Sequence, residues 1–253
     1  MSYDKTANRA QRLHNRESFL DNIASKLGRT KPVSQVERPA LKFTCHQEVM
    51  ATFSQDELKD ALITYANTAL GANAVVTTQA ELEATLKQVC LTYCQDEQGQ
   101  AIPGETILSA YEPLMELVSA QALETEQHHV YVWDQGAGYE ANIVVAERAK
   151  VGVVFAEQAL AESGTMVLYS CPDQGRAVSL LPEASVFVVP KSALVARLTQ
   201  ATDKLHEKAK QGERLPSCVN FISGPSSTAD IELIKVVGVH GPIYATYVII
   251  DDM

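Results

Sequence analysis

Short, unbroken apolar runs in the carboxyl-terminal half of the chain constrain its fold more than any other feature. Residues 151–155, 165–170, 185–190 and 218–223 each form such a run, and residues 244–251 form a last one. A strand with one wet face alternates apolar and polar residues, whereas these runs barely alternate. Unbroken runs of this length are typical of strands buried on both faces of a mainly parallel sheet. The chain therefore needs helices on the two faces of that sheet.

Helical patterns separate the strands. Ser54 with Glu57 forms a capping box, and Thr78 with Glu81 forms a second. Alternating strands and helices predict an α/β fold with right-handed crossovers. The principal helices are expected over residues 17–27, 54–71, 78–94, 113–124, 142–150, 191–210 and 228–234. Residues 29–46 are rich in proline and charge without periodicity, which is typical of a linker. We expect an amino-terminal helix and linker arm over residues 1–45 and one α/β domain over residues 46–253.

Composition and charge exclude several function classes. The chain has 253 residues, 46% of them hydrophobic, so it can bury a full core. Its formal net charge is −10, which disfavours binding to nucleic acid and to anionic membranes. No apolar run approaches the ~20 residues of a membrane span, and the first residues lack the apolar stretch of a secretory signal. These features predict a cytoplasmic protein; a homo-oligomer is compatible with them.

The five cysteines, Cys45, Cys90, Cys94, Cys171 and Cys218, form no CxxC pair. The sequence thus predicts reduced structural thiols and no metal or iron–sulfur cluster in this chain. HExxH, GxSxG and a GxGxxG after a strand are also absent, so the common metalloprotease, serine hydrolase and dinucleotide-binding signatures are missing.

The first candidate segment joins two of the predicted strands and carries Glu157 and Glu162. A carboxylate beyond a strand can act as nucleophile or general base. Ser163, Gly164 and Thr165 follow with hydroxyl groups and open backbone. The structural alternative is that these acids face water and that Gly164 makes a turn.

The second candidate segment contains Ser223, Gly224, Ser226, Ser227 and Thr228. Its hydroxyl and N–H groups could bind an anion at the start of the predicted helix. Asp230 and Glu232 complement a helix dipole in that turn but would repel a phosphate unless they point away. Capping of the helix is the structural alternative.

The third candidate is His240, which lies between Gly238 and Pro242 just before the last strand. A loop histidine can carry a proton or donate a hydrogen bond, or it can simply bond a neighbouring carbonyl. Because ligands of open α/β sheets bind where loops gather at the strand ends, we expect the three segments to converge on one edge of the sheet.

Taken together and in order, these segments resemble the lactate-utilisation protein C family, whose members carry the LUD domain. The resemblance is carried by residues 152–157, 162–165, 179–182, 222–232 and 238–242, and is nearly continuous over about residues 150–252. It implies a Rossmann-like three-layer α/β/α sandwich of the kind found in phosphosugar isomerases and CoA transferases. It also implies partner proteins, one rich in cysteine and one holding iron–sulfur clusters, which act together in oxidising L-lactate to pyruvate.

From this resemblance we expect an accessory subunit that binds a small organic anion or positions its partners. Ser163 to Thr165 and Ser223 to Thr228 would then bind the anion, and His240 would donate a hydrogen bond or move a proton. Glu157, Glu162 and Asp230 would orient these donors or play a structural part. Two alternatives stay open: a self-sufficient enzyme, related to CoA transferases or isomerases, that uses Glu157 or Glu162, and a purely structural scaffold.

Overall fold

The computed structural model describes residues 14–35, 37, 39–229 and 234–253. The chain divides into two compact units, Met1–Thr44 and Cys45–Met253. In the first unit the predicted helix is confirmed as α1, Arg16–Lys26. Its apolar residues Phe19, Ile23 and Leu27 are all exposed within this unit. None of the helices in the described part of the chain is long and apolar enough to span a bilayer.

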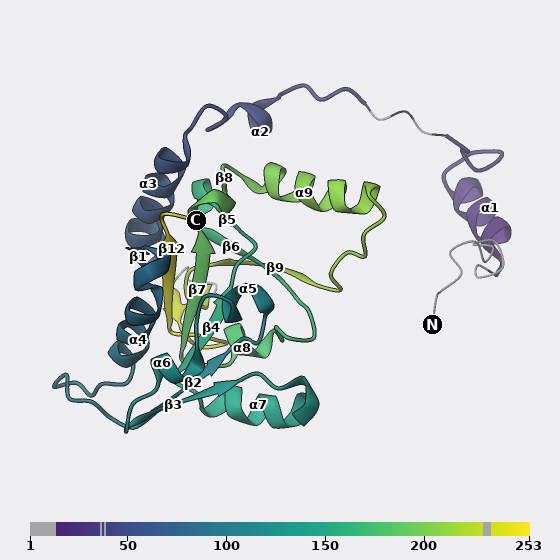
Figure 1. The fold of residues 1–253 in the computed structure, drawn as a ribbon. Coiled ribbons are helices and arrows are strands. Elements are labelled where there is room, and N and C mark those ends of the chain that lie inside the picture. Colours follow the sequence, from purple (N-terminus) through teal and green to yellow (C-terminus); the bar gives the residue numbers. More distant parts are fainter. Residues whose placement is uncertain (1–13, 36, 38, 230–233) are drawn as a thin grey trace. The chain divides into compact units, whose positions relative to one another are not determined.

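A six-stranded, wholly parallel sheet organises the second unit (Figure 1), which confirms the predicted α/β class. Its strands follow the spatial order β1-β12-β7-β4-β2-β3. The central strands β4 and β7 are buried along their whole length, as their unbroken apolar runs predict. The strands are β1 (Asn73–Thr77), β2 (Gly104–Leu108), β3 (His128–Val132), β4 (Val151–Phe155), β7 (Ala184–Pro190) and β12 (Tyr244–Ile250).

In the part of the chain that the structure describes, helices alone cover one face of this sheet. Val151 and Val153 of β4 belong to the same core cluster as Leu86 of α4 and Leu114 of α5, and all four are fully buried. Val154, the residue that follows Val153, belongs to the core on the opposite face. The helices on the first face are α4 (Leu82–Thr92), α5 (Glu112–Met115) and α6 (Ala120–Leu123).

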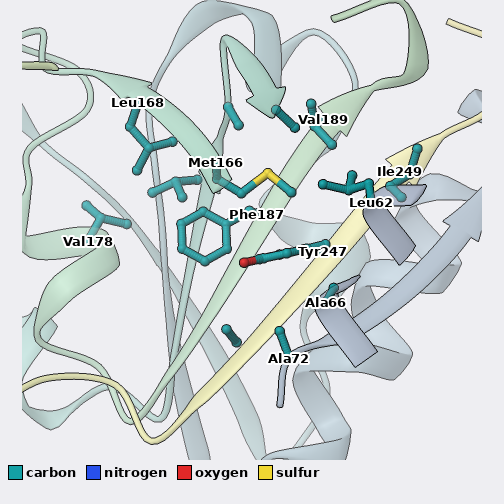
Figure 2. Close-up of a cluster of buried hydrophobic side chains, with 14 of the residues drawn as sticks. Leu62, Ala66, Ala72, Met166, Leu168, Val178, Phe187, Val189, Tyr247 and Ile249 are labelled. Atoms are coloured by element: carbon teal, nitrogen blue, oxygen red, sulfur yellow. The ribbon is translucent and has the colours of Figure 1, made fainter. Parts of the chain in front are cut away.

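The opposite face carries helices and a second sheet. This four-stranded sheet has the order β8-β5-β6-β9. Figure 2 shows Met166 and Leu168 of β6 packed over Phe187 of β7, with Tyr247 of β12 alongside. The strands are β5 (Gln158–Leu160), β6 (Thr165–Tyr169), β8 (Leu194–Val195) and β9 (Val219–Ser223), and the helices are α3 (Gln55–Tyr65), α7 (Tyr139–Arg148) and α8 (Ala177–Leu180).

Gly152 fixes how closely α8 approaches the central sheet. A Cβ atom at this position would lie 1.8 Å from the carbonyl oxygen of Val178 in α8. Such an overlap with backbone cannot be relieved by a side-chain rotation, so only glycine permits this contact. The sequence thus brings α8 against β4 by omitting one side chain.

Three predicted helices differ in the structure. Residues 113–124 form two short helices, α5 and α6, instead of one. A helix is expected over residues 228–234, but Thr228 and Ala229 belong to β10 (Ser227–Ala229), which pairs antiparallel with β11 (Lys235–Val237). Residues 230–233 lie outside the described part of the chain. At these two residues strand pairing, with Thr228 opposite Val236, takes the place of the predicted helix start. The predicted helix over 191–210 begins only at α9 (Leu198–Lys210), because Leu194 and Val195 pair with β5 as strand β8. The short elements that remain are α2 (Cys45–Glu48), η2 (Ala66–Leu70), η3 (Gln79–Glu81), η4 (Gln135–Ala137), η5 (Ala161–Ser163) and η6 (Lys191–Ala193).

Candidate functional site

The structure brings the first two candidate segments together. Thr165 and Ser223 lie directly opposite each other in the β6–β9 pair. The Thr165 hydroxyl is 2.6 Å from the Ser223 hydroxyl and 2.7 Å from the Ser163 hydroxyl. These three side chains therefore form a chain of hydroxyl groups, with buried Thr165 at its centre and Ser223 at its exposed end.

The buried side chain of Tyr247 links the same two segments through its hydroxyl group. Its hydroxyl accepts a hydrogen bond from the Gly224 N–H and donates one to the Gly164 carbonyl, both at 2.7 Å. Gly164 adopts φ +57°, and a Cβ there would lie 2.6 Å from a Leu70 methyl group. Burial raises the pKa of Tyr247 to about 12, because ionisation would place a charge in the core. Most polar groups of these two segments are therefore hydrogen-bonded to each other or to Tyr247.

His240 lies near Ser226 but at a different edge of the sheet from the one expected. The Ser226 N–H donates to the Pro242 carbonyl at 2.9 Å, and the Gly238 N–H donates to the Ser226 carbonyl at 2.8 Å. Residues 238–242 lead into β12, so they meet the amino end of that strand. The expected convergence at strand exits is therefore wrong for His240. Its exposed side chain borders a hollow of about 390 Å³ that also contains Lys150 and Glu183.

Ser227 and Thr228 belong to the exposed strand β10 rather than to a helix start. An anion site built on helical N–H groups therefore does not form at these two residues. Asp230, the remaining predicted residue of this segment, lies outside the described residues, as does Glu232.

Among the predicted residues that the structure describes, Glu157 alone lies at the carboxyl end of a central strand. It follows β4, and the Tyr111 hydroxyl, on the loop after β2, donates a short hydrogen bond to its carboxylate. Burial is the main reason that the pKa of Tyr111 is raised, and the Glu157 carboxylate adds to the effect. The half-buried pair can accept or share a proton at a strand exit.

Glu162 has a different environment, although it is only five residues further on. Its carboxylate pairs with the Arg197 guanidinium, with an Nε to Oε2 distance of 2.5 Å. Arg197 also donates to the carbonyl of Cys45 at 2.9 Å. This neutralising contact joins η5 to the residue that precedes α9, which fits a structural ion pair.

The strands β2 and β4 mark the point where the sheet's connections reverse direction. From β2 the chain passes through α5 and α6 on one face to β3, whereas from β4 it passes through α8 on the other face to β7. Ligands of open α/β sheets bind outside the carboxyl ends of such a strand pair. Tyr111 and Glu157 lie there.

Gln174 closes the floor of this switch point. Its side chain accepts from Ser109, at the end of β2, at 3.0 Å and from the Phe155 N–H, at the end of β4, at 3.1 Å. Its amide also donates to the Phe155 carbonyl at 3.2 Å. Sequence reasoning missed both Gln174 and Tyr111. Tyr111 follows a predicted strand, but that position indicates a site only when the order of the strands in the sheet is known. The same holds for Gln174, which contacts the ends of β2 and β4.

All five cysteines are free thiols. Among the residues the structure describes, no group of three or more His, Cys, Asp or Glu side chains is arranged to hold a metal ion. Cys90 and Cys94 are both buried in the helical layer, and burial raises the pKa of Cys90 to about 12. Since the thiolate is the form that binds metal, this pair is a poor ligand set.

Comparisons with known proteins agree with the fold. A model of the LUD domain matches residues 61–250. The chain is 44% identical over 244 residues to the "Uncharacterized protein YkgG" of Escherichia coli, covering 95% of this chain and 100% of that protein. It is 40% identical over 245 residues to "Lactate utilization protein C" of Geobacillus thermodenitrificans, covering 95% and 98%. It is also 40% identical over 240 residues to the protein of that name from Macrococcus caseolyticus, covering 95% and 97%.

A solved structure extends the likeness to three dimensions. The crystal structure of a DUF162 family protein from Deinococcus radiodurans superimposes with a TM-score of 0.54 at 18% identity, covering 78% of this chain and 99% of that one. At this identity the match supports the fold alone.

Proposed function

Because this chain belongs to the LUD-domain family, we propose that it takes part in lactate utilisation in the cytoplasm, as an accessory subunit that binds an organic anion and works with iron–sulfur partner proteins. The observation that carries the proposal is the 40% identity to proteins named lactate utilization protein C over 95% of the chain. This alignment extends beyond the α/β domain into the amino-terminal arm, so the similarity to these relatives covers nearly the whole chain.

The donor groups of the chain fit a subunit whose partners carry the electrons. Cys90 and Cys94 are buried neutral thiols, and the exposed thiol of Cys45 lies elsewhere, on α2. An electron relay in this system would therefore use clusters held by the cysteine-rich and iron–sulfur partners. Oxidation of a hydroxy acid to a keto acid releases two electrons, which such clusters can accept one at a time.

A gene deletion tests the proposal in the native organism. We expect the deletion strain to lose growth on L-lactate as the only carbon source, to keep growth on pyruvate, and to recover when the full-length chain is supplied. A tagged chain purified from lactate-grown cells should retain iron and acid-labile sulfide through its partners. Wild-type growth of the deletion strain on L-lactate would contradict the proposal.

A self-sufficient acyl-transferring enzyme is the second candidate, and the position of Glu157 favours it. In that mechanism a glutamate carboxylate attacks a CoA thioester and expels the CoA thiolate. The thiolate then attacks the glutamyl carbonyl of the anhydride, which releases the donor carboxylate and leaves a glutamyl thioester. Incubation with acetyl-CoA followed by borohydride should convert that thioester to an alcohol. Mass spectrometry would find the change on Glu157 and not on Glu162, whose carboxylate is paired with Arg197; unmodified glutamates would dismiss this candidate.

A scaffold role is favoured for one part of the molecule, the loops joined by Tyr247. Their hydroxyl and backbone groups bond one another, which is what a packing contact requires. Growth on L-lactate that survives Ser163→Ala and Ser223→Ala would assign these loops to structure, whereas loss of growth with an intact fold would assign them to ligand binding.

A further inference from the structure

A cleft of about 700 Å³ opens between α7 and α8, on the face of the sheet that carries the second sheet. Apolar side chains of both helices line it, among them Tyr139, Ile143 and Leu180, and Cys218 and Ser217 close its far side. Ligand pockets typically measure about 300–1,000 Å³ and combine mainly apolar walls with a few polar groups. The size and lining of this cleft match that description.

A second hollow of about 510 Å³ continues the cleft. The two share Ser170 and Ser217 in their linings, so they adjoin each other. Arg176 lies in the first hollow, and Arg214 and Leu215 lie in the second. The two hollows together thus combine an apolar body with two guanidinium groups.

The two arginines differ from the other arginines of the second unit, which has four. Arg148 binds Glu105 through two nitrogens, at 2.5 and 2.9 Å, and Arg197 binds Glu162. Within the described part of the chain, Arg176 and Arg214 have neither an ion pair nor a side-chain hydrogen bond, and both are exposed. The cleft region therefore holds the two arginines of the second unit for which the described residues supply no partner.

This absence of partners is unexpected for so acidic a unit. Residues 45–253 contain 12 lysines and arginines against 27 aspartates and glutamates. Carboxylates are abundant, yet none pairs with either arginine among the described residues. Two guanidinium groups that have no described partner beside an apolar cleft favour an anion from outside the chain, because guanidinium binds carboxylate, sulfonate and phosphate groups with two parallel hydrogen bonds.

We propose that the cleft between α7 and α8 binds an organic anion with an apolar body, whose acidic head lies against Arg176 and Arg214 and whose body lies along Tyr139, Ile143 and Leu180. The inference deepens the proposed anion-binding role and rests on it. It gives the ligand a larger apolar part than lactate has. Glu147 also lines the cleft, and it borders the hollow that contains the Lys150–Glu183 ion pair, so the acidic head is directed away from it.

The position of the cleft connects it with the switch point of the sheet. Arg176 directly follows the loop that contains Gln174, whose side chain bonds the ends of β2 and β4. The main chain of that loop also accepts a hydrogen bond from the Ala110 N–H through Asp173. An anion held by Arg176 therefore touches the segment that covers the carboxyl ends of the central strands.

Titration of the full chain with 8-anilinonaphthalene-1-sulfonate, an anion with an apolar body, tests the proposal. We expect one fluorescent site per chain, displaced by octanoate and far less by octanol or L-lactate. The double variant Arg176→Gln/Arg214→Gln should weaken binding about tenfold or more, since each lost charge-assisted bond contributes. Lys204→Gln is the matched control, because it removes an exposed cation of α9 outside the cleft and should bind as the wild type does.

A second pair of variants tests the apolar wall. Tyr139→Ala should weaken probe binding, whereas Val144→Ala, an exposed residue of the same helix outside the cleft, should leave it unchanged. Circular dichroism of each variant checks that the fold is intact. Equal binding by the double arginine variant and Lys204→Gln would overturn the site assignment alone. Absence of any saturable binding to the wild type would overturn the anion-binding part of the proposed function as well.

Two further outcomes would also reject the inference. Displacement by L-lactate as effective as that by octanoate would show that the apolar body plays no part. Probe binding that is unchanged in the double arginine variant, together with lost co-purification of the iron–sulfur partners, would identify the cleft as a protein-docking surface instead.

Discussion

The loops joined by Tyr247 and the cleft between α7 and α8 contain similar polar groups but use them differently. In the loops, hydroxyl groups and backbone amides bond one another across the β6–β9 pair. In the cleft, two arginines have no partner among the described residues. The comparison teaches that residue type alone does not identify a binding site. The partners of each polar group decide whether it stabilises the fold or is free for a ligand.

The largest effect that would test this comparison is expected from Tyr247→Phe. The variant leaves the buried Gly224 N–H and the Gly164 carbonyl without their partner, and each such group costs about 1–3 kcal/mol. We therefore expect the free energy of unfolding in urea to fall by about 2–4 kcal/mol. Tyr244→Phe, at an exposed position on the same strand, is the control and should change little. A small effect at Tyr247 would mean that the loops are not held together in this way.

The decrease in the free energy of unfolding at alkaline pH should depend on the same hydroxyl group. The pKa of Tyr247 is raised to about 12 in the folded state, above the value of about 10 for a tyrosine in an unfolded chain. Its contribution is fully present below pH 10 and is lost as the pH rises through the folded value, because only the unfolded chain ionises in between. Stability should fall by about 2 kcal/mol over this interval, and Tyr247→Phe should remove that part of the decline. If the free energy of unfolding of Tyr247→Phe decreased above pH 10 as much as that of the wild type, Tyr247 would not be the group responsible.

A smaller loss is expected from Thr165→Val, which keeps the shape of a buried side chain but removes the central hydroxyl group. Ser163 and Ser223 would lose a shared partner but can turn to water, so we expect a loss of about 1–2 kcal/mol. In a double-mutant cycle with Ser223→Ala the two effects should not add, because both variants break the same bond. Additive losses would show that the two hydroxyl groups act independently.

The sequence predicts the parts of the fold that depend on local pattern. The runs that became β4 and β7 are recognisable because strands buried on both faces cannot contain charges, and Ser54 with Glu57 caps α3 as predicted. The pairing of β10 with β11 was missed because Asp230 and Glu232 favour a helix start in the sequence, whereas Val236 and Val237, which follow closely, favour a strand. Pairing along the backbone decides between them.

The candidate sites were predictable in part for the same reason. Ser163, Thr165 and Ser223 were identified as polar loop residues, but their mutual bonding depends on the register between β6 and β9, far apart in sequence. The roles of Tyr111 and Gln174 can be recognised only when β2 and β4 are known to be neighbours in the sheet. Arg176 and Arg214 look ordinary in sequence, since what distinguishes them is a missing partner in space.

The smallest effect on stability is expected for the two arginines of the cleft. Arg176 and Arg214 are exposed and form no ion pair with described residues, so Arg176→Gln/Arg214→Gln should change the free energy of unfolding by no more than about 0.5 kcal/mol. The same measurement on Glu162→Gln, which breaks the half-buried contact with Arg197, should give a loss of up to about 1 kcal/mol. Urea unfolding of the three proteins side by side distinguishes these cases. A loss of about 2 kcal/mol or more in the double arginine variant, which is the cost of a buried unsatisfied group, would mean that these guanidinium groups support the fold. The cleft would then resemble the Tyr247 loops rather than differ from them.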